Sequence, residues 1–410
     1  MTKNERGIKA GYPKESLSIK QAKKLALLSQ RIPPITPKVD AAEATLAVIE
    51  HLGYVQIDTI SVIQRAHHHT IWNRNPRYLN SHIDQLMTNK QIFEYWSHAA
   101  AYLPMRDYRY SLIRKNAIKR GAQKHWHEVD HQLMDQVMRR IEKEGPLMAK
   151  DFEHTGKKTE DWRSKPAKQA LENLYIRGDI MVSYRQSFHK VYELTERVIP
   201  NNLDTSVPSM EEYARFLIRQ YLKANGIGLA SEMTYLLKKT KPIVNATLKQ
   251  MLADGEILEV KLGDQNYFIL ESSLELLNKP LNHHQLKILS PFDNLIIQRK
   301  RTQAIFGFNY LLECYLPEKK RQYGYFSLPI LWDGNLVARM DCKADRQTSK
   351  LYIHHLFLEK GIEKKEEFAQ ALSKELNEFM KFNACDSILL NRTNPSAFKS
   401  ILLNRLMNKV

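Results

Sequence analysis

Apolar residues recur at helical spacing along the chain, and the runs end at a glycine that leads into a short apolar strand. The four positions of this pattern occur three times, as Leu46, Ile49, Gly53 and Val55, as Leu171, Leu174, Gly178 and Ile180, and as Leu248, Met251, Gly255 and Ile257. Each copy predicts a helix with one apolar face, a glycine at its C-terminal end and an extended segment. The repetition predicts three related structural units.

The second and third copies continue into pairs of short apolar and alternating segments. These segments are 180–184 with 190–194, and 257–260 with 267–270 around the turn Gly263-Asp264. A Gly-Asp turn between such segments is typical of a β-hairpin. A helix, a glycine stop and a hairpin together describe a winged helix-turn-helix, so the sequence predicts three winged units in tandem.

Beyond residue 286 the pattern changes to strands. Leu336, Ala338 and Met340 alternate with residues that include charged side chains, which indicates an antiparallel sheet or small barrel with a charged outer face. The predicted fold class is therefore α+β, with three tandem winged helix-turn-helix units and a C-terminal antiparallel β-barrel-like domain. The predicted boundaries are a tail at 1–15, a first winged unit with a helical extension at 16–120, a second unit at 121–200, a third at 209–280, and a β-rich domain with terminal helices at 286–410.

Three further segments carry local signals. Ser18 is a candidate N-cap for an amphipathic helix over residues 18–28, and a second helix follows Asp40 and ends at Gly53. Residues 83 to about 120 are expected to form a helical stretch. Their aromatic segment Phe93-Glu94-Tyr95-Trp96-Ser97-His98 is expected to pack between units.

The charge of the chain points to a polyanionic partner. Lys and Arg number 62 against 45 Asp and Glu, so the net charge is +17 and the pI is about 9.5. The basic residues are scattered over the whole length, which favours a folded basic surface that binds nucleic acid. The alternative is a basic protein whose charge only keeps it soluble.

Several basic side chains fall where a recognition helix would meet phosphates. Arg163, Lys165 and Lys168 belong to the helix before the second hairpin, and Arg299-Lys300-Arg301 forms a dense basic run before the C-terminal strands. We expect these residues to contact the DNA backbone. Any one of them alone could equally lie on a solvated helix face.

The most chemically suggestive pair is Gln56 and Asp58. Because Val55 and Ile57 alternate with them, an extended backbone places the carboxamide and the carboxylate on one face. Such a pair can hold and activate a water molecule. The alternative is that Asp58 only caps a helix beginning near residues 59–62.

The run His67-His68-His69 raises the question of a metal site. Three adjacent histidines on a regular element cannot converge on one ion, and the chain has no His-Glu-x-x-His motif. We therefore expect no metal site and no cofactor. Beside a DNA channel these histidines and Arg65 could donate hydrogen bonds to phosphates.

The remaining signals bound the class of protein. Cys314, Cys342 and Cys385 are far apart, which excludes a disulfide framework and a cysteine zinc site. The sequence has no glycine-rich phosphate loop, no apolar N-terminal run and no apolar stretch long enough for a bilayer. We expect a cytoplasmic protein without a membrane segment, and nothing in the sequence requires more than a monomer.

The sequence resembles the bacterial tandem winged-helix DNA glycosylases of the AlkZ/YcaQ-like family. The similarity covers most of the chain. It is carried by Gln56-Ile57-Asp58, Arg65-Ala66-His67-His68, Phe93-Glu94-Tyr95-Trp96-Ser97-His98, Lys165-Pro166-Ala167-Lys168, Leu289-Ser290-Pro291-Phe292-Asp293 and Ala338-Arg339-Met340-Asp341.

The resemblance implies excision of N7-alkylated purines from double-stranded DNA and, in the branch with a Gln-apolar-Asp triplet, unhooking of interstrand crosslinks. It implies that Gln56 and Asp58 are catalytic, with Asp58 stabilising the oxocarbenium and taking a proton from the attacking water. A non-catalytic winged-helix regulator remains the main alternative. A metal-dependent nuclease using the histidines is the third possibility.

Overall fold

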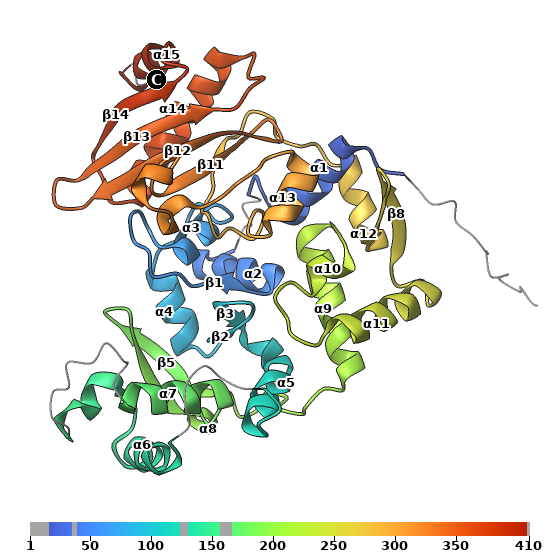
Figure 1. Cartoon of the computed structure of the whole chain (residues 1–410), viewed down its shortest axis with the longest axis vertical. Coiled ribbons are helices and arrows are strands. Elements are labelled where there is room, and N and C mark those ends of the chain that lie inside the picture. The colour runs from blue at the N-terminus through green and yellow to red at the C-terminus, as the bar shows by residue number, and fades with distance from the viewer. Residues whose placement is uncertain (1–15, 35–38, 124–129, 156–165, 408–410) are drawn as a thin grey trace, which may run out of the picture.

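We describe the fold from a computed structural model of the chain, over residues 16–34, 39–123, 130–155 and 166–407. The predicted tail at 1–15 lies outside these residues. In Figure 1 the C-terminal sheet lies at the top, the segment around β1 at the centre, and two further helix and strand groups lie below and to the right.

The central group contains one small antiparallel sheet with the strand order β1-β3-β2. Its elements are α2 (Ala41–Leu52), β1 (Val55–Gln56), α3 (Ala66–Trp72), α4 (Ser81–Thr88), β2 (Ile92–Trp96) and β3 (Ala100–Pro104). Asp40 caps α2, and Gly53 ends it with a φ of 78°, a left-handed conformation that glycine adopts without a Cβ penalty. Both ends of this helix confirm the sequence prediction.

The second group repeats the same order of elements. It contains α6 (His131–Glu144), β4 (Leu147–Met148), the short 3-10 helix η2 (Ala149–Thr155), α7 (Pro166–Arg177), β5 (Ile180–Gln186), β6 (His189–Leu194) and α8 (Thr195–Val198). The strand order is β4-β6-β5. The helix α5 (Tyr108–Lys119), preceded by η1 (Met105–Asp107), joins the first group to the second and packs on α7.

The third group again orders its strands as β7-β9-β8. Its elements are α9 (Met210–Asn225), β7 (Ile227–Gly228), α10 (Ala230–Met233), α11 (Lys241–Ala253), β8 (Leu258–Leu262), β9 (Gln265–Ile269), α12 (Glu271–Leu274) and η3 (Glu275–Asn278). In all three groups the strand after the first helix pairs with the last strand, which occupies the centre of the sheet.

This topology shows that the first copy of the sequence repeat does not fall on the same elements as the other two copies. In the second and third groups the repeated positions fall on α7 with β5 and on α11 with the segment that enters β8, the second helix–strand pair of each group. In the first group they fall on α2 with β1, the first pair. The equivalent pair there is α4 with β2. Between them Lys90, with a positive φ of 55°, stands where the other two groups have Gly178 and Gly255. The pattern misled because a glycine can end any helix whose face is apolar.

Residues 83–120 also differ from the prediction of one helical stretch. The segment Phe93–His98 forms β2 and its turn, and β2 pairs with β3 in register from Ile92 with Pro104 to Trp96 with Ala100. Phe93 and Tyr95 are buried in the core. Aromatic side chains favour a pleated, half-buried surface, and this preference outweighed the helical pattern on either side.

The C-terminal part is an open sheet of five strands in the order β10-β11-β12-β13-β14. Its elements are β10 (Lys287–Ile288), α13 (Arg299–Phe306), η4 (Glu313–Tyr315), η5 (Glu318–Lys320), β11 (Ser327–Trp332), β12 (Asn335–Asp345), β13 (Lys350–Leu358), α14 (Lys365–Phe382), β14 (Ser387–Asn394) and α15 (Phe398–Met407). Since α14 crosses between β13 and β14, these two strands are parallel. The prediction of an antiparallel barrel was therefore wrong. One strand pair is parallel, and among the described residues the edge strands β10 and β14 do not pair with each other to close the sheet.

The first helix, α1 (Ile19–Ser29), begins at Ser18 with a capping box, as predicted. Its apolar face does not join the core of the first group, although the carbonyl of its last residue, Ser29, lies 2.5 Å from His51 Nε2 of α2. Its buried residues, including Leu25, share a core with Ile269 of the third group and Leu289 of the C-terminal part. A separate core joins the first group, the second group and the C-terminal sheet. These shared cores fix the groups against one another around β1.

Candidate catalytic site

Gln56 and Asp58 lie at the end of β1, where the strand leaves the first sheet. Gln56 pairs with Ala101 of β3, and the Ile57 amide donates a hydrogen bond of 2.8 Å to the Ala100 carbonyl. Val55 and Ile57 are buried in the core. The extended backbone predicted from the alternation is therefore present.

Asp58 does not cap a helix. Its Oδ1 accepts a hydrogen bond of 2.7 Å from the Ile60 amide, and the next helix begins only at Ala66. The capping prediction was wrong because the carboxylate closes a local turn instead. Burial raises the pKa of Asp58, and the Ile60 hydrogen bond partly offsets that rise. A half-buried carboxylate with a raised pKa is suited to accept a proton.

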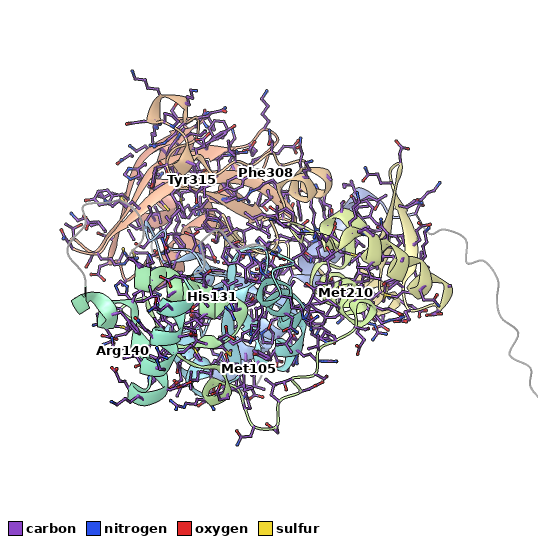
Figure 2. All side chains as sticks on the ribbon, turned by 60° about the horizontal axis from the view of Figure 1, so that its bottom comes forward. Met105, His131, Arg140, Met210, Phe308 and Tyr315 are labelled. Atoms are coloured by element: carbon purple, nitrogen blue, oxygen red, sulfur yellow. The ribbon has the colours of Figure 1, made fainter. Side chains whose placement is uncertain are left out.

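Residues of the C-terminal part lie within electrostatic range of Asp58. The pKa of the Cys314 thiol and that of the Tyr315 hydroxyl are raised, first by burial and then by the Asp58 charge. Tyr315 is nevertheless 73% exposed, and Tyr325 is also exposed. Figure 2 places Tyr315 on the C-terminal part of the molecule. Sequence reasoning did not assign Tyr315 to the site, and its distance in sequence from Asp58 gave no signal.

The carboxamide of Gln56 is oriented by a histidine. His98 Nε2 lies 3.0 Å from Gln56 Oε1. Because an amide oxygen only accepts, His98 Nε2 carries the proton and donates it. Burial lowers the pKa of His98 to about 4, so the imidazole is neutral near pH 7. The amide nitrogen of Gln56 is thereby left as the end that can donate to a substrate or a water.

Aromatic rings hold His98 in place. Its ring meets that of Tyr54 edge-on at a centroid distance of 5.1 Å, and that of Tyr235 at 5.4 Å. Tyr54 immediately precedes the strand of Gln56, and Tyr235 follows α10 of the third group. The first and third groups thus both position the histidine that orients Gln56.

The loop after Asp58 is fastened to the C-terminal part. The Gln64 amide donates to Asn383 Oδ1 at 2.8 Å, and the Ala344 amide donates to the Val62 carbonyl at 2.9 Å. On the other side, Asn294 Nδ2 donates to the Tyr54 carbonyl at 3.0 Å. Both ends of the segment that carries Gln56 and Asp58 are therefore held by residues distant in sequence.

The three histidines of α3 pack against neighbouring parts of the protein. His67 and His69 are buried, and His69 Nε2 donates to the Ile288 carbonyl at 2.8 Å. His68 Nδ1 lies 2.6 Å from the Tyr78 hydroxyl. Burial lowers the pKa of all three, to about 3 for His68 and to about 4 for His69. The structure therefore places them in the packing around α3, and their contact with DNA stays a prediction.

Arg65 lies against the hairpin turn of the second group. Its guanidinium carbon is 3.9 Å from the centroid of the Phe188 ring, and that of Arg185 is 4.4 Å away from the same ring. Burial, followed by the charges of Arg346 and Arg185, lowers the pKa of Arg65. Arg185 pairs with Glu94 at 2.7 Å. Arg65 thus lies near two further guanidinium groups, of which that of Arg185 is compensated by Glu94.

The basic residues that were predicted to contact DNA differ in how far they are exposed. Lys168 is exposed on α7 and Lys300 is exposed on α13. Arg301 is buried, with its Nη1 3.0 Å from Glu232 Oε2. Arg299 is half-buried and donates to the carbonyls of Ile296 and Pro291. Arg163 and Lys165 lie outside the described residues.

Within the described ranges, no three His, Cys, Asp or Glu side chains are grouped so that they could hold a metal ion. None of the helices built from those same residues is both long and apolar enough to cross a bilayer.

The fold is shared with a DNA glycosylase of known structure. Streptomyces sahachiroi DNA glycosylase AlkZ superposes with a TM-score of 0.63 and 16% sequence identity, over 92% of this chain and 100% of that chain. A sequence model described as DNA glycosylase AlkZ-like matches residues 49–382, which include Gln56 and Asp58. The class of protein is therefore a DNA glycosylase of the DNA repair type. The chain belongs to the AlkZ-like DNA glycosylase family.

Proposed function

We propose that this chain is a monofunctional glycosylase that excises N7-alkylated purines from double-stranded DNA and unhooks interstrand crosslinks. The observation that carries the proposal is the placement of the half-buried Asp58 beside Gln56 at the end of β1. The exposed aromatic side chain of Tyr315 lies within electrostatic range of the same carboxylate.

Release of the base needs an ionised carboxylate rather than a general acid. An N7-alkylated purine is already cationic, so it leaves as a neutral base without protonation. As the glycosidic bond breaks, positive charge develops on the deoxyribose, and the ionised Asp58 stabilises it. Water then attacks the anomeric carbon and passes its proton to Asp58. No lysine nucleophile takes part, so the expected product is an abasic site.

Gln56 would position the water or the sugar through its amide nitrogen. His98 occupies the amide oxygen, so the nitrogen is the end available for donation. A fixed donor beside the carboxylate restricts where the nucleophile can sit, which lowers the entropic part of the barrier.

The three groups would act as winged helix-turn-helix units on DNA. The repeated strand pairing of the three sheets supports this assignment, as do the exposed Lys168 and Lys300. Arg65 has no ion pair among the described residues and lies with Arg185 and Arg346. We propose it as a phosphate contact. The same arrangement needs only one copy of the chain, so we propose a monomer.

The decisive experiment incubates the protein with a duplex containing 7-methylguanine, without added metal and with a chelator in a parallel sample. Release of the free base that persists with chelator and disappears in Asp58→Asn supports the proposal. Binding without base release would instead support the regulator. Strand cleavage that requires a divalent ion would support the nuclease. A duplex with a crosslink through N7 of guanine tests unhooking separately.

A further inference from the structure

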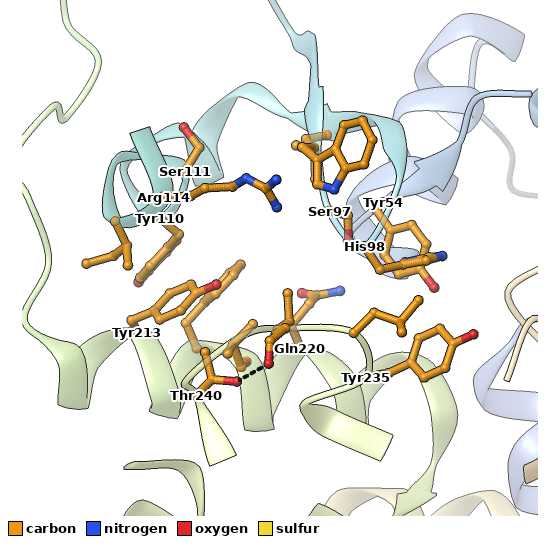
Figure 3. Close-up of a pocket in the computed structure, with 18 of the residues that line it drawn as sticks. Tyr54, Ser97, His98, Tyr110, Ser111, Arg114, Tyr213, Gln220, Tyr235 and Thr240 are labelled. Atoms are coloured by element: carbon orange, nitrogen blue, oxygen red, sulfur yellow. Dashed lines mark hydrogen bonds between the residues drawn. The ribbon is translucent and has the colours of Figure 1, made fainter. Parts of the chain in front are cut away.

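A cavity of about 770 Å³ lies between the first and third groups. Cavities of about 300–1,000 Å³ are typical of sites for small molecules. Figure 3 shows α5 and the β2–β3 turn on one side of the cavity and α9 on the other. Gln56 and Asp58 are not part of its wall, but His98 is. The cavity is therefore separate from the catalytic pair, and His98, which bonds to Gln56, links the two.

Aromatic rings form much of the cavity wall. Tyr54, His98 and Tyr235 form one edge-to-face set, and the rings of Tyr110 and Phe216 stack in parallel at 3.7 Å. Planar rings at both places favour a planar aromatic ligand.

A cation without a carboxylate partner points into this space. Figure 3 shows the guanidinium of Arg114 extending from α5 into the cavity. Its carbon lies 5.3 Å from the Trp96 ring centroid. None of the ion pairs among the described residues includes Arg114, and its Nε is buried without a hydrogen-bond partner. A buried guanidinium donor without a partner is costly, and an anionic ligand would satisfy it.

A polar atom of Asn294 and the basic residues of the wall also favour a polar, anionic ligand. Asn294 is only 7% exposed and lines the cavity, and its Oδ1 has no hydrogen-bond partner. That oxygen could accept a hydrogen bond from an amino or imino group of a ligand. The charged residues in the wall are predominantly basic. They are Arg114, Arg120, Lys238 and Lys239 against Asp107 and Glu232, and Glu232 is already paired with Arg301.

From these contacts we infer that the cavity binds a purine nucleotide, with the base among the aromatic rings and the phosphate at Arg114. The nucleotide could be free in solution or be one that is extruded from a bound DNA strand. The inference does not depend on the proposed glycosylase mechanism, because binding is measured without base release.

The test titrates deoxyguanosine monophosphate into the full-length protein and follows binding by calorimetry. Arg114→Gln should weaken the affinity by about tenfold or more, since a charge-assisted contact is lost. Ser111→Phe, which projects a ring into the cavity without changing the charge, should also weaken it. Lys119→Gln on the same helix lies outside the wall and should bind as the wild type does.

Three outcomes overturn the inference. They are failure of the wild-type protein to bind the nucleotide at millimolar concentration, equal affinity of the Arg114→Gln and wild-type proteins, and equal affinity for inorganic phosphate and for the nucleotide. Thermal unfolding of each variant separates loss of binding from loss of folding.

A competition experiment identifies the source of the nucleotide. If a strand nucleotide occupies the cavity, an intact duplex with a lesion displaces the free nucleotide, whereas a duplex with an abasic site at that position does not. If the ligand is a free nucleotide, neither duplex displaces it. Both results support a nucleotide site, and they assign it to different ligands.

Discussion

The side chains of His98 and Gln56 are joined by a hydrogen bond of 3.0 Å between Nε2 and Oε1. The bond connects the turn between β2 and β3 to the end of β1. It places the neutral imidazole behind the carboxamide and leaves the amide nitrogen of Gln56 free to donate. The orientation of this catalytic candidate therefore depends on a residue that does not itself need to touch the substrate.

We predict that His98→Ala lowers kcat for base release by about 10- to 100-fold, because a misdirected amide no longer positions the water. KM for DNA should change little. His98→Gln can still donate a hydrogen bond and should recover part of the rate. The exposed His284 provides the control, since His284→Ala should leave both constants unchanged. An equal loss in His98→Ala and His98→Gln would contradict the orienting role.

Asp58→Asn should lower the rate of base release by about 10²- to 10⁴-fold while DNA binding is retained. Asp58 acts only when ionised, and burial raises its pKa. The acid limb of kcat/KM should therefore lie at a higher pH than the ordinary value of about 4 for aspartate. Single-turnover rates across the acid range measure this limb. A rate that stays constant to below pH 4 would exclude Asp58 as the base.

Stability should fall as the pH is lowered through the window below 6.5. In the folded chain the buried His69 remains neutral until its pKa of about 4, whereas in the unfolded chain it takes up a proton near 6.5. Protons therefore favour the unfolded state. His69→Gln should reduce the loss of unfolding free energy between about pH 7.5 and about pH 5 by about 2 kcal/mol. Denaturant titrations at both pH values measure it.

Arg74 and Asp293 form a fully buried ion pair of 2.8 Å that joins the end of α3 to the turn after β10. Arg74→Met should lower the free energy of unfolding by about 3–5 kcal/mol, because Asp293 is left charged and buried. The double variant Arg74→Met with Asp293→Leu should recover much of the loss. The exposed pair of Arg405 with Glu366 is the control, and Arg405→Gln should cost at most about 1 kcal/mol.

Two neighbours in the basic run should differ in what they do. Lys300 is exposed, so Lys300→Gln should lower DNA affinity and reduce the salt dependence of binding by about one phosphate contact. Arg301 is buried against Glu232, so Arg301→Gln should reduce stability instead. Filter binding at several salt concentrations, with thermal unfolding in parallel, separates the two. A weaker DNA affinity in Arg301→Gln with unchanged stability would contradict this assignment.

Some elements were predictable because their causes are local. The cap at Ser18, the glycine end of α2 and the extended backbone at Val55–Gln56 all follow from side chains within a few residues. The hairpins β5–β6 and β8–β9 follow from turns between apolar segments. The pairing of Gln56 with Asp58 as a candidate site has the same local origin.

Other features depended on contacts between distant segments. The β2–β3 hairpin within 83–120 becomes part of a sheet because β3 also pairs with the distant β1, and the C-terminal sheet stays open because α14 crosses over to make β14 parallel. The burial of Arg301 comes from Glu232, which is 69 residues away in the chain. A sequence pattern contains the charge of such a residue but not the partner that removes it from the surface.

The sequence by itself determined that β1 would present a carboxamide and a carboxylate from one short extended segment, since side-chain alternation is a property of the backbone. Only the tertiary structure decided what each group faces. His98 orients the amide of Gln56, and the C-terminal part places Tyr315 within electrostatic range of Asp58. Packing of separate groups into shared cores sets these distances, because burial rewards close approach of apolar surfaces whatever their separation along the chain.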